Sequence, residues 1–232
     1  MSALRLIAGR DCARTRWKNG GGWTTELARD VYTGGDGVSA ASAAANGLIG
    51  SAFNWRVSIA QIECDGPFSV FPGIERDLLL LEGNGIELDI GDAPPIRLAQ
   101  RFGQVHFAGE ASVQCRLLAG PTRDFNVMTR RDRVCAEVVA RPLVGPMVIF
   151  PAVGVTWLAH AFSGHADARA GTERVALAAG DTLRIDFNAR GAPRVVLDGG
   201  GELVLVKLEP TPASSANQGG PQSGSARAKP AA

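Results

Sequence analysis

Apolar residues occupy every second position along much of this chain, and this alternation limits the folds open to it. Between Phe53 and Ile59, aromatic and branched side chains alternate with Asn54, Arg56 and Ser58, the period of two expected for a half-buried strand. No stretch combines a helical period with capping residues. Similar short runs, separated by Gly and Pro, occupy residues 23–28, 77–82, 86–90, 96–100, 105–107, 113–118, 125–129, 134–139, 147–150, 156–162, 174–177, 182–186, 194–197 and 202–208. Many short strands predict an all-β sandwich or barrel.

One connection in this pattern carries a specific turn signal. The run Leu78–Leu81 is apolar on both faces and predicts a buried strand. Gly83-Asn84-Gly85 follows it and predicts a hairpin turn, after which the chain returns through Ile86–Ile90.

Two alternating segments, Ala111–Leu118 and Glu202–Leu208, resemble each other, and each closes one half of the chain. This weak repetition indicates two similar small barrels, which would account for the length of 232 residues. Ala140-Arg141-Pro142 is the expected joint between the halves. The alternative, that any two hairpins look alike, stays open.

Two segments are expected outside the core. Gly34–Ser51 is rich in Gly, Ala and Ser, which predicts a flexible surface insertion between strands. Thr211–Ala232 contains no large apolar residue, which predicts a disordered tail.

Composition excludes several classes of protein. A net charge of +1 argues against nucleic-acid binding, which needs clustered Lys and Arg. No run approaches the length of about 18 apolar residues that a membrane span requires. Met1–Arg14 has no secretory pattern, so we expect a cytoplasmic protein without a membrane partner. The cysteines are far apart and unpaired in spacing, which predicts reduced thiols rather than disulfides or zinc ligands at Cys12, Cys64, Cys115 and Cys135.

The segment Trp17–Glu26 reads Trp-Lys-Asn-Gly-Gly-Gly-Trp-Thr-Thr-Glu and is the strongest candidate for a functional motif. Three consecutive glycines suit a backbone that turns sharply or lies close to another group. The motif places a cation and a carboxamide, Lys18 and Asn19, beside these glycines. It predicts contact with a small molecule.

Polar residues recur within segments that otherwise look like core strands. Such side chains need partners or a ligand if they are buried. If they face the inside of a barrel, they line a cavity that suits a small carboxylate, held by charge-assisted hydrogen bonds. The candidate ligand-binding residues are Lys18, Asn19, Thr24, Glu26, Arg56, Ser58, Arg76, Asn126 and Met128.

Each of these residues also has a purely structural interpretation. Glu26 can form a structural ion pair with Arg56 or Lys18. Asn19 can serve only the tight turn of the glycines, and Arg76 can be a solvated charge at a rim. The tryptophans can be core residues.

Catalysis has less support. His106, His160 and His165 show no metal-ligand spacing, and no nucleophile elbow, phosphate loop or dinucleotide fingerprint occurs. Glu26 and Asp124 are carboxylates that can form an acid–base pair if the fold brings them together.

The chain resembles the HutD/Ves family over about residues 4 to 135. The resemblance lies in four blocks: residues 17–22 with Thr24 and Glu26, 55–60, 66–76, and 120–128. It implies a double cupin (bicupin), with two jelly-roll-like β-barrels in one chain. We accordingly expect an N-terminal barrel at 1–140, a C-terminal barrel at 141–210 and a tail at 211–232. The family also implies a role in histidine utilisation, through binding of an intermediate such as N-formylglutamate or urocanate.

Metal-binding cupins carry a histidine cluster that this chain lacks. The corresponding region, around Leu80–Asp89, contains Glu87 and no histidine. We therefore expect no metal and no cofactor.

Three hypotheses follow. The first is a metal-free, regulatory carboxylate-binding protein, with Lys18 and Arg56 or Arg76 holding the carboxylate. The second is a metal-independent isomerase, epimerase or hydrolase that uses Glu26 as acid or base. The third is a dimeric scaffold whose polar faces form interface pairs, and a homodimer is compatible with all three.

Overall fold

The computed structural model describes residues 2–31, 53–212 and 227–229. The predicted insertion at 34–51 lies outside the described residues, as does most of the predicted tail. The described chain is all-β except for one 3-10 turn, Gly9–Asp11. It divides into two compact units. The N-terminal unit holds Ala13–Val134 with the strand at 227–229, and the C-terminal unit holds Met1–Cys12 with Cys135–Pro210.

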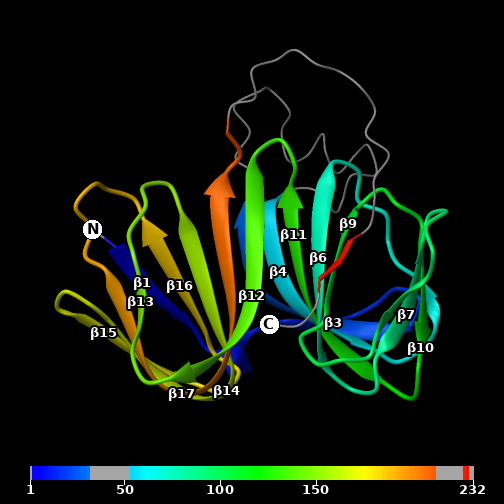
Figure 1. The fold of residues 1–232 in the computed structure, drawn as a ribbon, viewed down its shortest axis with the longest axis horizontal. Coiled ribbons are helices and arrows are strands. Elements are labelled where there is room, and N and C mark those ends of the chain that lie inside the picture. The colour runs from blue at the N-terminus through cyan, green and yellow to red at the C-terminus, as the bar shows by residue number, and fades with distance from the viewer. Residues whose placement is uncertain (1, 32–52, 213–226, 230–232) are drawn as a thin grey trace. The chain divides into compact units, whose positions relative to one another are not determined.

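The larger sheet of the N-terminal unit has seven antiparallel strands in the order β18-β9-β6-β11-β4-β3-β2. Figure 1 shows β4, β11, β6 and β9 side by side in this sheet. The strands are β2 (Arg14–Arg16), β3 (Gly22–Val31), β4 (Phe53–Ile62), β6 (Ile74–Glu82), β9 (Gln104–Ala108), β11 (Thr122–Arg130) and β18 (Arg227–Lys229). The last of these falls within the segment predicted to be a disordered tail.

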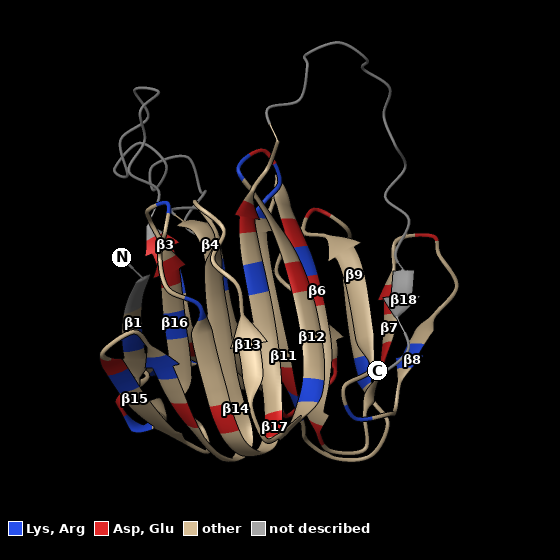
Figure 2. Cartoon of the chain, turned by 60° about the vertical axis from the view of Figure 1, so that its left-hand side comes forward, with Lys and Arg blue, Asp and Glu red and all other residues tan. Residues whose placement is uncertain are grey.

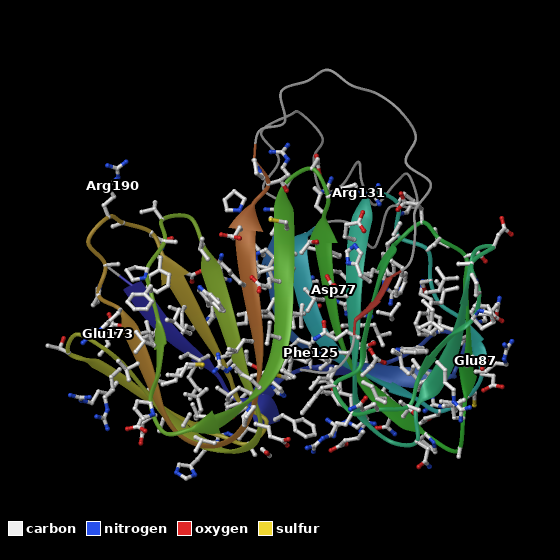
Figure 3. All side chains as sticks on the ribbon, in the orientation of Figure 1. Asp77, Glu87, Phe125, Arg131, Glu173 and Arg190 are labelled. Carbon is white, nitrogen blue, oxygen red and sulfur yellow. The ribbon has the colours of Figure 1, made fainter. Side chains whose placement is uncertain are left out.

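The second sheet of this unit has four strands in the order β5-β10-β7-β8. These are β5 (Gly66–Pro67), β10 (Val113–Leu117), β7 (Ile86–Ile90) and β8 (Ile96–Leu98). An apolar cluster joins the two sheets, with Leu78 of β6, Leu88 of β7 and Phe107 of β9 among its buried members. Figure 3 shows these strands with their side chains, including Asp77 on β6 and Glu87 on β7.

The hairpin predicted around Gly83-Asn84-Gly85 is wrong. Both edges of β6 are already paired, one with β9 and the other with β11. The chain therefore crosses to the second sheet after Glu82, where Ile86–Ile90 pairs with β8 and β10. The glycine-rich turn is local, but the choice of partner strand depends on residues far along the chain.

The C-terminal unit contains one seven-stranded sheet, in the order β1-β16-β14-β17-β12, with β13 on β17 and β15 on β14. Its buried cluster includes Leu183, Ile185, Phe187 and Leu203. The strands are β1 (Ser2–Ile7), β12 (Val134–Val144), β13 (Met147–Ile149), β14 (Thr156–Ala170), β15 (Glu173–Ala178), β16 (Thr182–Phe187) and β17 (Val195–Pro210).

Strands in this unit are longer than the alternation predicts. The strand predicted at 156–162 continues to Ala170 as β14, through an irregularity between Ala161 and Ser163. The two strands predicted at 194–197 and 202–208 are one strand, β17. The expected joint at Ala140-Arg141-Pro142 lies within β12, and the division between the compact units falls between Val134 and Cys135.

Charged side chains of both signs intermingle on the strands of each unit, in agreement with the net charge of +1 (Figure 2). In the part of the chain that the structure describes, no helix is long and apolar enough to cross a membrane.

Candidate functional site

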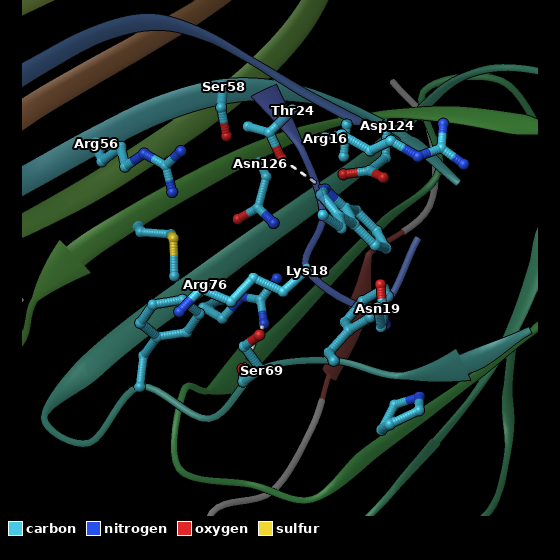
Figure 4. Close-up of a pocket in the computed structure, with 16 residues that line it drawn as sticks. Arg16, Lys18, Asn19, Thr24, Arg56, Ser58, Ser69, Arg76, Asp124 and Asn126 are labelled. Carbon is cyan, nitrogen blue, oxygen red and sulfur yellow. Dashed lines mark hydrogen bonds between the residues drawn. The ribbon is translucent and has the colours of Figure 1, made fainter. Parts of the chain in front are cut away.

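The N-terminal unit contains a cavity of about 590 Å³ (Figure 4). Every candidate residue predicted from the sequence lines it except Glu26. The rest of the lining comes from residues that the prediction did not select: Arg16, Trp17, Ala60, Pro67, Phe68, Ser69, Phe71 and Asp124.

The register of three neighbouring strands builds the floor of this cavity. On β11 and β4, Asn126 lies opposite Ser58, and Met128 lies opposite Arg56. Met128 also lies opposite Arg76 of β6 on its other side. Because side chains alternate between the two faces of a strand, these residues share one face of the sheet.

The same pairing extends the floor toward β3. Asp124 of β11 lies opposite Ala60 of β4, which in turn lies opposite Thr24 of β3. Asp124 and Asn126 are two residues apart on β11 and therefore point to the same side. The alternation visible in the sequence around Asn126 places Asp124 on this face as well, although Asp124 was not among the predicted binding residues.

The glycine-rich motif forms one wall of the cavity as a tight turn between β2 and β3. The amide of Trp17 donates to the carbonyl of Gly22 at 2.9 Å, and the amide of Gly20 donates to the carbonyl of Trp17 at 3.0 Å. The indole Nε1 of Trp17 donates to Oγ1 of Thr24 at 2.8 Å. Asn19 accepts from the Gly21 amide at 3.0 Å, so it does serve the turn. Lys18 and Asn19 are exposed at the rim of the cavity.

Glu26 forms the ion pair that its structural interpretation proposed. Arg56 Nε donates to Glu26 Oε2 at 2.8 Å, and Arg29 Nε lies 3.4 Å from the other carboxylate oxygen. Glu26 therefore holds Arg56 from the side of β3.

Arg76 is 6% exposed, so its interpretation as a solvated rim charge is wrong. Its guanidinium carbon lies 5.1 Å from the ring centre of Phe68 and 5.0 Å from that of Phe107, within the range of cation–π contacts. Its Nη1 donates to the Ser69 carbonyl at the long distance of 3.5 Å, and its Nε has no partner. Burial lowers the pKa of Arg76 to about 10, against the opposing attraction of Asp124.

Asp124 is 1% exposed, and neither of its carboxylate oxygens has a hydrogen-bond partner. Burial raises the pKa of Asp124 to about 7, although the nearby charge of Arg76 opposes this shift. For both residues the loss of hydration outweighs their mutual attraction. The Oδ1 atom of Asn126 is also buried without a partner.

The three histidines do not line the cavity. His106 contacts Asp77 at 3.0 Å and Glu75 at 3.1 Å on the surface of the N-terminal unit, and these carboxylates raise the pKa of His106 to about 10. His160 is buried beside Thr182 in the C-terminal unit. Over residues 2–31, 53–212 and 227–229, no three His, Cys, Asp or Glu side chains gather in a way that would hold a metal ion.

The cavity therefore combines a buried guanidinium, a second arginine fixed by a carboxylate, and a lysine at the rim. Its inner wall also carries unpaired acceptor oxygens. The cationic groups suit a small anion, because an anion that enters the cavity exchanges water for charge-assisted hydrogen bonds.

Comparison with known proteins gives consistent results. The HutD family model matches residues 9–205. An uncharacterized 21.2 kDa protein from the hutC 3′ region of Pseudomonas putida is 36% identical over 189 residues, which are 81% of this chain and 90% of that protein. Protein Ves of Citrobacter koseri is 45% identical over 87 residues, 37% of this chain and 45% of Ves.

The solved structure of HutD from Pseudomonas fluorescens SBW25 matches with a TM-score of 0.70 at 29% identity. The match covers 90% of this chain and 100% of that one. The resemblance predicted from the sequence is thereby confirmed, together with an all-β, cupin-like fold.

Proposed function

The chain belongs to the HutD family, and on this basis we propose that it binds a small carboxylate in the cavity of its N-terminal unit. The binding modulates histidine utilisation, the process with which the HutD name is associated. N-formylglutamate and urocanate are the ligands to test first, since both are carboxylates of histidine breakdown.

The observation that carries this proposal is the buried Arg76. Arg76 lines the cavity, and its buried Nε has no hydrogen-bond partner. Leaving a charged donor unpaired in a desolvated site costs free energy, which a bound carboxylate recovers. The volume of about 590 Å³ also lies within the range of small-molecule sites.

The lining residues divide into three roles in this proposal. Arg76 and Lys18 hold the carboxylate, and Arg56, whose charge is offset by Glu26, can donate further hydrogen bonds. The hydroxyl and amide groups orient the remainder of the ligand, and Met128 supplies an apolar wall. The orienting residues are Asn19, Thr24, Ser58 and Asn126.

Isothermal titration calorimetry with N-formylglutamate and urocanate tests the proposal, with thermal unfolding as a second readout. A ligand that binds only the folded state raises the free energy of unfolding by about 2.7 kcal/mol at a hundred times its Kd. Absence of heat and of any thermal shift at millimolar ligand would refute carboxylate binding.

We further propose that the two compact units are the two cupin domains of a bicupin. The all-β composition of each unit supports this assignment. A homodimer and a cytoplasmic location are part of the same proposal, and analytical ultracentrifugation and cell fractionation test them.

A second candidate is a metal-independent enzyme. The pKa of Asp124, raised by burial to about 7, suits an acid or base at neutral pH. Glu26, the base expected from the sequence, is instead paired with Arg56. Turnover of candidate ligands, followed by NMR, would have to disappear in Asp124→Asn and persist in Glu26→Gln for this candidate to replace the first.

A further inference from the structure

The cavity has two chemically different ends. Arg76, Lys18 and Arg56 supply donors, whereas the part lined by Asp124 and Asn126 presents three buried acceptor oxygens without a donor. Figure 4 shows Asp124 and Arg56 on opposite sides of Asn126. The carboxylate of a ligand can accept hydrogen bonds from the donors but cannot donate to the acceptor oxygens.

The hydroxyl groups that line the cavity do not satisfy these oxygens. Thr24 accepts its own hydrogen bond from the Trp17 indole. Neither Thr24 nor Ser58 donates a hydrogen bond to the Asp124 oxygens, since both oxygens are without a partner. Buried acceptors of this kind cost free energy until a donor arrives.

The balance of charge indicates what kind of donor fits. Arg56 is neutralised by Glu26 at 2.8 Å, and Arg16 lies 3.6 Å from Glu63. Of the charges that line the cavity, Arg76, Lys18 and Asp124 remain, and they sum to one positive charge when Asp124 is ionised. A single ligand carboxylate cancels that charge. An ammonium group would have to give up its strong hydration to reach these buried oxygens, whereas a neutral N–H does not, so a neutral N–H is the donor that fits.

Burial restricts the size of the donor. Asp124 is 1% exposed and Asn126 is 7% exposed. A donor must therefore enter between side chains of the lining rather than lie on an open surface. A single N–H on a flat group meets this requirement better than a bulky or strongly hydrated one.

We propose that Asp124, together with Asn126, accepts a hydrogen bond from the ligand, so that the cavity selects carboxylates that also carry a neutral amide or azole N–H. This inference rests on the proposed carboxylate binding and defines the ligand class for that site. Asp124 is then a specificity-determining residue, and donation to its carboxylate stabilises the ionised form that burial opposes.

Two pairs of ligands test the inference on the unaltered protein. Urocanate is compared with (E)-3-(furan-2-yl)acrylate, which keeps the carboxylate and a flat ring but has no N–H. N-acetylglycine is compared with acetoxyacetate, in which an ester oxygen replaces the amide N–H. Calorimetry at neutral pH should show that removal of the N–H weakens binding about tenfold to a hundredfold in at least one pair.

A variant then assigns the effect to Asp124. In Asp124→Asn the ratio within the discriminated pair should fall to about threefold or less, because hydrogen bonds to a neutral acceptor are weaker than those to a carboxylate. The control is Asp89→Asn, which removes an exposed carboxylate paired with Arg116 outside the cavity and should leave the ratio unchanged.

The outcomes separate the two proposals. Equal binding within both pairs would overturn the role of Asp124 while leaving carboxylate binding intact. If none of the four ligands binds at millimolar concentration, carboxylate binding itself fails and the inference fails with it. The comparison of ligands on the unaltered protein decides the matter even if Asp124→Asn does not fold.

Discussion

The Nε atom of Arg56 donates a hydrogen bond to Oε2 of Glu26 at 2.8 Å, across the pairing of β4 and β3. This contact takes the only carboxylate of the Trp17–Glu26 motif out of the cavity lining. The motif therefore supplies the cavity with a lysine, an amide and a hydroxyl, while its carboxylate fixes a neighbouring arginine.

Glu26→Gln should destabilise the fold slightly and leave ligand binding nearly intact. The pair is partly exposed, with side-chain exposures of 31% and 25%, so its loss should lower the free energy of unfolding by about 1 kcal/mol. Affinity for a carboxylate should change by less than about threefold, since Glu26 does not line the cavity. Urea unfolding and calorimetry measure both quantities. Glu87→Gln, at the exposed pair with Arg116, is the matched control. A larger loss of affinity would mean that Glu26 contacts the ligand.

Arg76→Met should weaken carboxylate binding at least about tenfold, because the buried guanidinium is replaced by an uncharged side chain. The free energy of unfolding should fall, since the substitution leaves Asp124 buried without the charge that attracts it. Calorimetry and urea unfolding test the two parts separately. Arg116→Met, outside the cavity, should bind as the unaltered protein does. Unchanged affinity in Arg76→Met would remove the observation on which carboxylate binding rests.

Asp124 should make the protein less stable as the pH rises from about 4 to about 7. Its carboxyl group ionises near 3.8 in the unfolded chain, whereas burial raises the pKa to about 7 in the folded protein. Between these values the folded state binds more protons than the unfolded state, so the free energy of unfolding falls until the pH passes 7. Asp124→Asn lacks this pH dependence of the free energy of unfolding.

Urea unfolding at pH 5 and pH 8 measures this effect. The unaltered protein should lose roughly 3 kcal/mol more than Asp124→Asn between the two values. Other titrating groups, such as His106 and Glu75, are common to both proteins and cancel in the comparison. Parallel loss of stability in the two proteins would show that Asp124 is ionised throughout this range.

The three motif glycines should differ in their tolerance of alanine. A Cβ on Gly22 would overlap the carbonyl oxygen of Gln61 and lie 3.2 Å from the Trp17 ring, so Gly22→Ala should cost more than about 2 kcal/mol or prevent folding. Gly20 has φ of 74° with open space around it, so alanine there should cost about 1 kcal/mol. Gly21→Ala, whose Cβ would meet only Asn19 at 3.4 Å, serves as the control. Urea unfolding followed by tryptophan fluorescence ranks the three variants, and equal losses would contradict this account.

Local alternation predicts most strands of this protein because it reports which side of a strand is buried. The strand predicted at 86–90 is β7 without change, and that predicted at 113–118 is β10 to within one residue. The alternation does not predict β1. This strand pairs with β16, with Ser2 opposite Phe187, so its partner lies far along the chain. The pairing of β6 and β7 was also predicted wrongly, since a turn does not determine which sheet the chain enters next.

The sequence by itself determined the shared faces of the candidate site. A period of two places Thr24 with Glu26, Arg56 with Ser58, and Asp124 with Asn126, whatever the strands pair with. It also contains the four blocks that resemble the HutD/Ves family, because each block is a continuous segment of the chain.

Only the tertiary structure decided which polar residues are paired and which are isolated. Glu26 meets Arg56 through the register of β3 and β4, whereas Asp124 is enclosed by neighbours that give it no donor. Hydration is a property of everything that surrounds a group, so the raised pKa of Asp124 and the burial of Arg76 arise only when distant strands assemble. These two residues, rather than the motif carboxylate, therefore define the chemistry that the cavity offers.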